Sequence, residues 1–223
     1  MSIALSLGNN LTTGGVFKAS AVNNTSCNNI TDFAGIAGGG TLILLSTQTA
    51  SASANISFTT GIDSTYDEYI FKFINIHPSA NTDFQFNLST DGGSNYNVTK
   101  TTTVFTAYHD EGDTASGITY QTSQDLAQST SYQTLSWNVS TDNDGNLSGD
   151  LHLFNPSSTT YVKHFISRNS HTEYASGSGK TYAEDFYVAG YGNTTSAVNA
   201  INFKFSSGNI DDGIIKMYGV AKS

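Results

Sequence analysis

Apolar and polar residues alternate with a period of two through most of this chain. Between residues 40 and 220, apolar and polar residues alternate in short runs, and no segment of useful length shows a helical period. In the run from Thr82 to Ser89, Phe84, Phe86 and Leu88 alternate with polar residues. Because successive side chains of a β-strand point to opposite faces, this pattern predicts a half-buried antiparallel strand. Parallel units need a helix between strands, so the pattern argues against them.

About ten strands of this kind follow one another, with turn signals roughly every eight to twelve residues, as is typical of sandwiches and barrels. The expected strands cover residues 41–47, 54–59, 66–77, 82–89, 95–107, 132–139, 147–154, 161–167, 182–191, 200–206 and 214–220. We therefore predict an all-β fold, an antiparallel, jelly-roll-like β-sandwich over residues 40–223. Periodicity does not encode strand order, so other sandwich topologies remain open.

Local signals add detail to this prediction. Asp91-Gly92-Gly93-Ser94 is a glycine turn and predicts that strands 82–89 and 95–107 form a hairpin. Residues 108–126 are less regular, and we expect a long loop there with a short strand at 118–121. A polar loop is expected from 168 to 180.

The run from Tyr66 to His77 changes phase near its end. Phe71 and Phe73 share one face by period two, whereas Ile74 and Ile76 fall on the other. Either both faces of this strand are covered, or a bulge shifts the phase. Pro78 should end the strand, because proline cannot donate a hydrogen bond to a neighbouring strand.

The first 39 residues differ from the rest of the chain. They are rich in Asn, Thr, Ser and Gly, with Gly14-Gly15 and Gly38-Gly39-Gly40 as breaks. A flexible terminus would have this composition, but the small apolar clusters favour an extended N-terminal arm that docks on a partner. The residues expected to make this contact are Ile3, Leu5, Leu7, Val16, Phe17, Ile30, Phe33 and Ile36.

Charge narrows the range of partners. The chain has 9 basic and 18 acidic residues, a net charge of −9, and no basic stripe. Because nucleic-acid binding depends on neutralising phosphates, a nucleic-acid partner is not expected. The single cysteine, Cys27, excludes an internal disulfide framework, so the fold must be held by packing and hydrogen bonds.

Targeting and membrane signals are weak. The start, from Met1 to Gly8, lacks a basic region and a long apolar region, so we expect no signal peptide and synthesis in a cytoplasm. The longest apolar run, from Leu42 to Leu45, is too short to span a bilayer, so no membrane insertion is expected.

The chemistry-bearing residues form no convincing catalytic or metal site. Residues 142–146, Asp-Asn-Asp-Gly-Asn, resemble a calcium loop, but leucines stand where that loop needs glycine and glutamate, so a turn is favoured. His109-Asp110-Glu111-Gly112-Asp113 is more typical of a solvated acidic loop than of a metal site. No nucleophile elbow or phosphate-binding loop occurs. We therefore expect neither an enzyme nor a cofactor.

Tyrosine is abundant, with 12 residues. Five of them lie at predicted loops or strand ends: Tyr108, Tyr120, Tyr132, Tyr174 and Tyr191. Aromatic faces can stack on sugars or anchor protein interfaces, although packing at the edge of a core is the commoner role.

Several stretches of the sandwich region resemble virion structural proteins of marine tailed bacteriophages. They are Leu44–Ser51, Ile56–Tyr69, Phe71–Pro78, His152–Thr160, Ser206–Ile210 and Ile215–Gly219. The resemblance covers roughly residues 40 to 220 and leaves the arm outside. It carries no catalytic residues.

The resemblance implies a structural protein on the exterior of a phage particle, either a capsid decoration protein or a short head fibre. Its arm would contact other virion proteins of the capsid or tail, and by analogy with phage surface proteins it would be a homotrimer. The alternative is the receptor-binding tip of a tail fibre with a host-surface glycan as ligand, bound by loops such as 108–128 and 168–180.

Overall fold

The computed structural model describes residues 42–175 and 179–221, and in these residues every named element is a strand. The predicted arm of residues 1–39 lies outside the described residues. The strands are β1 (Leu42–Thr49), β2 (Ile56–Phe58), β3 (Glu68–Pro78), β4 (Thr82–Ser89), β5 (Lys100–Asp110), β6 (Ser116–Tyr120), β7 (Gln133–Val139), β8 (Leu147–Phe154), β9 (Lys163–Ala175), β10 (Lys180–Gly192), β11 (Ala200–Phe205) and β12 (Ile210–Val220). All their pairings are antiparallel, which confirms the predicted all-β antiparallel class.

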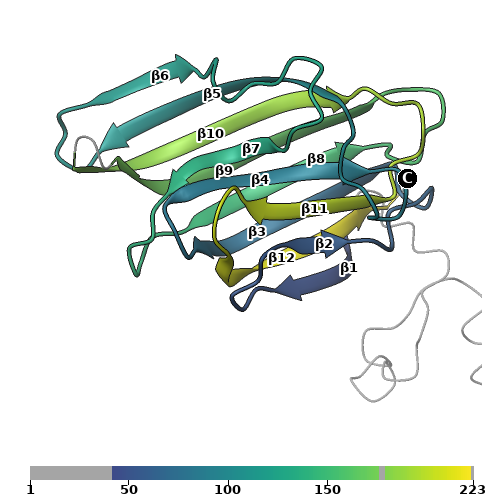
Figure 1. Cartoon of the computed structure of the whole chain (residues 1–223), viewed down its shortest axis with the longest axis horizontal. Coiled ribbons are helices and arrows are strands. Elements are labelled where there is room, and N and C mark those ends of the chain that lie inside the picture. Colours follow the sequence, from purple (N-terminus) through teal and green to yellow (C-terminus); the bar gives the residue numbers. More distant parts are fainter. Residues whose placement is uncertain (1–41, 176–178, 222–223) are drawn as a thin grey trace, which may run out of the picture. The chain divides into compact units, whose positions relative to one another are not determined.

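Pairing divides the strands into two layers that lie one over the other (Figure 1). The large layer has the order β1-β12-β3-β8-β9-β10-β5-β6, and the small layer has the order β2-β11-β4-β7. A single pair, Val139 with Glu173, joins β7 to β9. Pairing therefore continues from β1 through both layers to β2, and the sheet curls into a nearly closed form.

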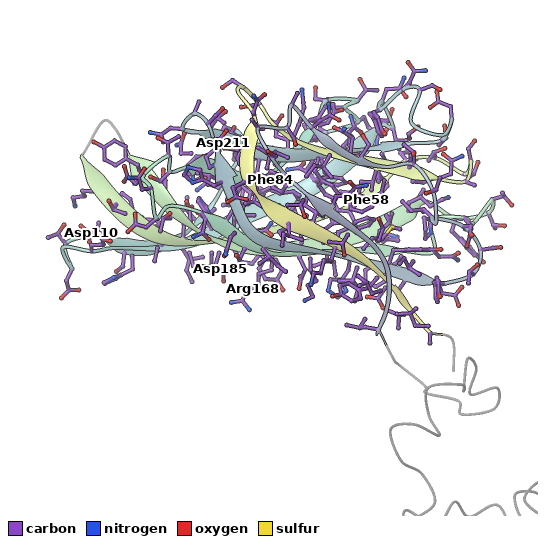
Figure 2. All side chains as sticks on the ribbon, turned by 90° about the horizontal axis from the view of Figure 1, so that it is seen from below. Phe58, Phe84, Asp110, Arg168, Asp185 and Asp211 are labelled. Atoms are coloured by element: carbon purple, nitrogen blue, oxygen red, sulfur yellow. The ribbon has the colours of Figure 1, made fainter. Side chains whose placement is uncertain are left out.

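The core between the layers is built from phenylalanine rings. Phe203 of β11 lies at its centre, within 5.2 to 6.4 Å (centroid to centroid) of five other rings from both layers: Phe58, Phe71, Phe73, Phe84 and Phe86. Figure 2 shows Phe58 and Phe84 inside the molecule. The inward sets predicted from period two, including Phe84, Phe86 and Leu88, are fully buried.

Three details of the third and fourth strands were predicted correctly. The register of β3 shifts between Phe73 and Ile76, which confirms the bulge. Asn75 has a φ of 51°, and Ile76 is buried while Ile74 is exposed. The strand ends at Pro78. In the turn after β4, Gly92 and Gly93 have φ values of 72° and 89°, which glycine adopts without steric cost.

The predicted hairpin of residues 82–89 and 95–107 is wrong. β4 pairs with β7 and β11 in the small layer, whereas β5 pairs with β6 and β10 in the large layer. Glycine turns reverse the chain, but they do not decide which strands pair. Here the chain crosses from one layer to the other between β4 and β5.

Two predicted loops contain more strand than expected. β5 continues to Asp110 and pairs with β6, so the loop expected at 108–126 begins later, and the short strand lies at 116–120. The loop expected at 168–180 is largely the end of β9, which pairs with β10 up to Ala175 and Lys180. The polar residues of this segment suggested a loop, but some of them face a buried polar cluster and are compatible with a strand.

No helix in the described part of the chain is long and apolar enough to cross a membrane.

Candidate binding face

The outward side of β8, β9, β10, β5 and β6 forms the most distinctive surface, called here the outer face. Strand register places Tyr120, Phe105, Tyr187 and Arg168 in one row across β6, β5, β10 and β9. Because side chains alternate, their sequence neighbours point inward to the core, as the burial of Val104, Phe186 and Val188 shows. Figure 2 shows Arg168 and Asp185 on the outside, away from Phe58 and Phe84.

A ridge of stacked planar groups crosses this face. The rings of Phe105 and Tyr187 lie 4.9 Å apart at an angle of 9°. The guanidinium of Arg168 lies 5.9 Å from the centre of the Tyr187 ring and donates two hydrogen bonds to Asp185 Oδ2, at 3.0 and 2.7 Å. This carboxylate raises the pKa of Arg168. The stacked rings and the hydrogen-bonded guanidinium thus form one continuous row of planar groups.

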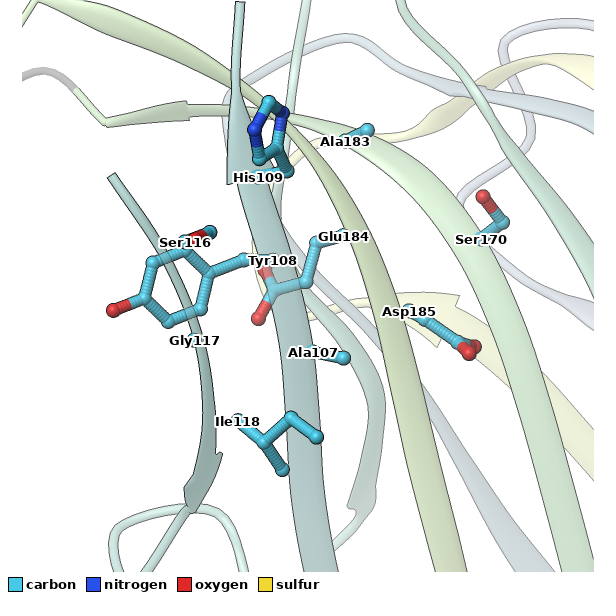
Figure 3. Close-up of a pocket in the computed structure, with 10 residues that line it drawn as sticks. All are labelled: Ala107, Tyr108, His109, Ser116, Gly117, Ile118, Ser170, Ala183, Glu184 and Asp185. Atoms are coloured by element: carbon cyan, nitrogen blue, oxygen red, sulfur yellow. The ribbon is translucent and has the colours of Figure 1, made fainter. Parts of the chain in front are cut away.

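A shallow depression of about 460 Å³ lies on one side of the ridge (Figure 3). Ala107, Ala183 and Ser170 give it a floor of small side chains. His109, Ser116, Ile118 and Asp185 also line it, so that imidazole, hydroxyl, carboxylate and aliphatic groups all reach one open surface.

A second depression of about 500 Å³ lies on the other side of the ridge. Its floor is formed by Gly190 and Ala189 with Thr103. The rings of His164 and Tyr191, with centroids 6.0 Å apart, line it together with other side chains: Thr101, Phe154 and Ile166. Apolar ring surfaces beside hydroxyl and imidazole groups suit a ligand that has both apolar faces and hydroxyl edges.

Under the outer face, the inward side of β9 and β10 carries a cluster of buried titratable groups. Glu184 accepts a hydrogen bond of 2.5 Å from the indole of Trp137, and its carboxylate lies 3.5 Å from His171 Nε2. Burial, together with the neighbouring charge of Glu173, raises the pKa of Glu184 to about 7. Burial also raises the pKa of Glu173. At neutral pH the carboxyl group of Glu184 therefore retains its proton in part of the molecules.

His171 belongs to this cluster and is kept neutral. It is buried, and neither ring nitrogen has a hydrogen-bond partner among the described residues. Burial lowers its pKa to about 4. The cluster therefore avoids buried charge, which would be costly in the interior.

A buried lysine, Lys100, connects the two layers. Lys100 Nζ donates hydrogen bonds to Asn87 Oδ1 at 2.5 Å and to the carbonyl of Val98 at 2.9 Å. Burial lowers its pKa to about 7. The contacts connect β4 to β5 across the layers, so we assign Lys100 a structural role.

The residues that the sequence analysis singled out lie in different parts of the structure or outside the described residues. All eight residues of the predicted docking set lie outside the described residues, as does Cys27. The segment 142–146 forms a turn in which Gly145 donates a hydrogen bond of 2.7 Å to the carbonyl of Asp142, as predicted. His109 lies 3.2 Å from Asp113. No group of three or more His, Cys, Asp or Glu side chains in residues 42–175 and 179–221 is arranged to hold a metal ion.

Of the five tyrosines considered, three belong to the outer face or line its depressions. Tyr120 is in its row, Tyr108 lines the first depression, and Tyr191 lines the second. Tyr132 instead packs under Lys204, whose Nζ lies 4.5 Å from the ring centre. Sequence reasoning missed Phe105, Tyr187 and Arg168, because no local pattern brings β5, β9 and β10 together. It also missed Glu184, which reads as a solvated residue until β10 pairs with β9.

No family model matches this chain, and neither the curated proteins nor the solved structures contain a match to it.

Proposed function

We propose that this protein is a structural protein on the exterior of a bacteriophage particle, a capsid decoration protein or short head fibre attached through residues 1–39. The proposal starts from the resemblance of residues 40–220 to phage virion proteins. The observation that carries it furthest is an architecture of paired strands whose described depressions are open surfaces. Such a fold suits attachment and display, and it is held without an internal disulfide, since the chain has one cysteine.

We also propose that the fold is a jelly roll. Removing the hairpins β5-β6 and β9-β10 leaves eight strands, with the orders β1-β12-β3-β8 and β2-β11-β4-β7. When these eight strands are numbered 1 to 8 along the chain, the order is 1-8-3-6 in one layer and 2-7-4-5 in the other. Two interlocked Greek keys give this order, and viral capsid and lectin domains use it. The two hairpins widen one layer and build the outer face.

Immunogold electron microscopy of parent particles, with antibody against residues 40–223, tests the placement. Label over the head is expected for a decoration protein. Label restricted to the tail would instead support the glycan-binding function considered below. Unlabelled intact particles would overturn the virion proposal.

Deleting residues 1–35 is expected to abolish incorporation into particles while the sandwich remains folded. The sandwich is expected to stay folded because residues between Ala50 and Met217 form a buried hydrophobic cluster of their own. Incorporation is measured by immunoblot of purified particles, and folding by the cooperative unfolding transition of the truncated protein. Normal incorporation of the folded truncated protein would contradict the docking role.

A second function, binding of a host-surface glycan, is favoured by one observation, the two depressions beside an aromatic ridge. Sugar rings present apolar faces that pack on aromatic rings and hydroxyl groups that bond to polar side chains. The aromatic and polar side chains around the two depressions belong to strands of the outer face. The sequence instead predicted a glycan site in loops such as 108–128 and 168–180.

Tyr191→Ala is expected to weaken glycan binding at least about tenfold, or 1.4 kcal/mol, because it removes a ring from the second depression. Tyr161→Ala is the matched control, since Tyr161 is 70% exposed and lines neither depression described above. Binding is measured on glycan arrays and with purified host surface polysaccharide. Equal binding by both variants, or no binding by the native protein, would rule out this site.

A further inference from the structure

The exposed apolar side chains of this protein concentrate on two strands. Nine large hydrophobic side chains are exposed among the described residues, and five of them belong to β1 and β6. Those five are Leu42, Ile43, Leu44, Ile118 and Tyr120. The two strands comprise only 8 and 5 residues. Leu44 is 52% exposed and Ile118 is 77% exposed, so both are unusually open for aliphatic residues in strands.

β1 and β6 are also the two edges of the large layer. Among the described residues, β1 pairs with β12 alone, and β6 pairs with β5 alone. Figure 1 shows them at opposite borders of the layer. Each edge therefore presents a row of backbone groups that can pair with a further strand.

Neither edge is protected in the usual way. Proteins blunt free edges with charged residues, proline or very short strands. β1 (LILLSTQT) and β6 (SGITY) contain no charge and no proline. A register shift after Leu44 disturbs β1, but only beyond its apolar half. The small layer follows the rule, because β2 has three residues and β7 is joined to β9.

Strand direction makes the two edges complementary to each other. Neighbouring strands in the large layer are antiparallel throughout, and the layer has eight strands. Because this number is even, β1 and β6 run in opposite directions. If a second copy places its β1 beside β6, the antiparallel alternation continues without a break. A twofold contact at one edge would leave the other apolar edge bare in every copy.

We infer that copies of this protein associate head to tail, with β1 of one copy adding to β6 of the next. Repetition of such a contact closes into a ring when the rotation between copies allows it. Burial of the exposed leucines and isoleucines drives the association. This inference rests on the proposed function, takes up the homotrimer expected by analogy with phage surface proteins, and assigns its interface. Placement on the particle is tested separately by immunogold labelling, so either can fail alone.

Cysteine cross-linking of the full chain tests the contact. In a Cys27→Ser background, the double variant Leu44→Cys/Ile118→Cys is expected to form disulfide-linked oligomers on mild oxidation, up to three subunits. Each single variant is expected to remain uncross-linked, whereas co-expression of the two single variants should yield mixed dimers. Cross-linking of a single variant with itself would show a twofold contact and overturn the head-to-tail arrangement.

Sedimentation velocity gives a second, independent measurement. Ile118→Lys is expected to weaken association at least tenfold, because it puts a charge into the apolar contact. Tyr161→Lys adds the same charge at an exposed aromatic residue away from either edge and should leave association unchanged. A monomeric native protein, or equal association of both variants, would overturn the inference. So would coverage of β1 by the arm of its own chain, which would abolish every cross-link.

Discussion

Phe203→Ala is expected to lower the free energy of unfolding by about 3–5 kcal/mol, a large fraction of the roughly 5–15 kcal/mol that stabilises a typical domain. Phe203 is fully buried at the point where rings from both layers converge. Removing its ring takes away contacts with five other phenylalanines at once and leaves a cavity that strands on both sides are too rigid to fill. The expected loss of stability thus has two parts: the hydrophobic free energy of burying the benzyl group, and the cost of the cavity that its removal leaves.

Urea denaturation provides the measurement, with the fluorescence of Trp137 as the signal, since it is the only tryptophan. Phe105→Ala is the matched control, because Phe105 is 41% exposed on the outer face and stacks on a single ring. Its loss should cost about 1 kcal/mol. Phe203→Leu should retain most of the packing and remain folded. Equal losses for Phe203→Ala and Phe105→Ala would contradict the proposed centre of the core.

Glu184→Gln is expected to stabilise the protein by about 3 kcal/mol at pH 8 and to have little effect near pH 4.5. The pKa of Glu184 is raised from an ordinary value of 4.5 to about 7 in the folded protein. Between these two values the folded state holds a proton that the unfolded state has released. Stability therefore falls as pH rises from 4.5 to 7, by about 1.4 kcal/mol for each unit. Glutamine keeps the shape of the neutral side chain and removes this loss.

The measurement is the difference in unfolding free energy between Glu184→Gln and the native protein at several pH values. A difference is required because neighbouring groups also titrate. His171, whose pKa is lowered to about 4, makes stability rise between pH 4 and 6.5. Lys100, with a pKa lowered to about 7, makes stability rise between pH 7 and 10.5. A difference that does not grow between pH 4.5 and 7 would show that Glu184 ionises normally.

The fluorescence of Trp137 offers a direct control on the raised pKa of Glu184. Its indole N–H donates to Glu184, so ionisation of the carboxyl group should change the fluorescence of the folded protein. The native protein should show a transition with a midpoint near pH 7, and Glu184→Gln should lack it. Asp185→Asn, on the adjacent outward position of the same strand, should retain it.

Much of the fold follows from local pattern. The steric alternation of a strand repeats every two residues, so the inward sets around Phe84, Leu151 and Phe203 can be assigned from a few neighbours. Pro78 restricts the backbone, whereas Gly92-Gly93 permit positive φ, and the strand end and the turn that they predict are present. The sequence by itself therefore determined the all-β class, the inward faces and most of the turns.

Only the tertiary structure decided which strands pair. Pairing depends on contacts between residues far apart in the chain, and the glycine turn after β4 gave no information on whether β5 would be its partner. Once β5, β10 and β9 lie side by side, Phe105, Tyr187 and Arg168 form one ridge, and Glu184 comes to face His171 in the interior. The same polar residues that predicted a loop at 168–180 are compatible with a strand because they alternate between solvent and the interior, where Asn169, His171 and Glu173 are buried. Burial and neighbours, which no local pattern contains, determine both the outer face and the unusual pKa values beneath it.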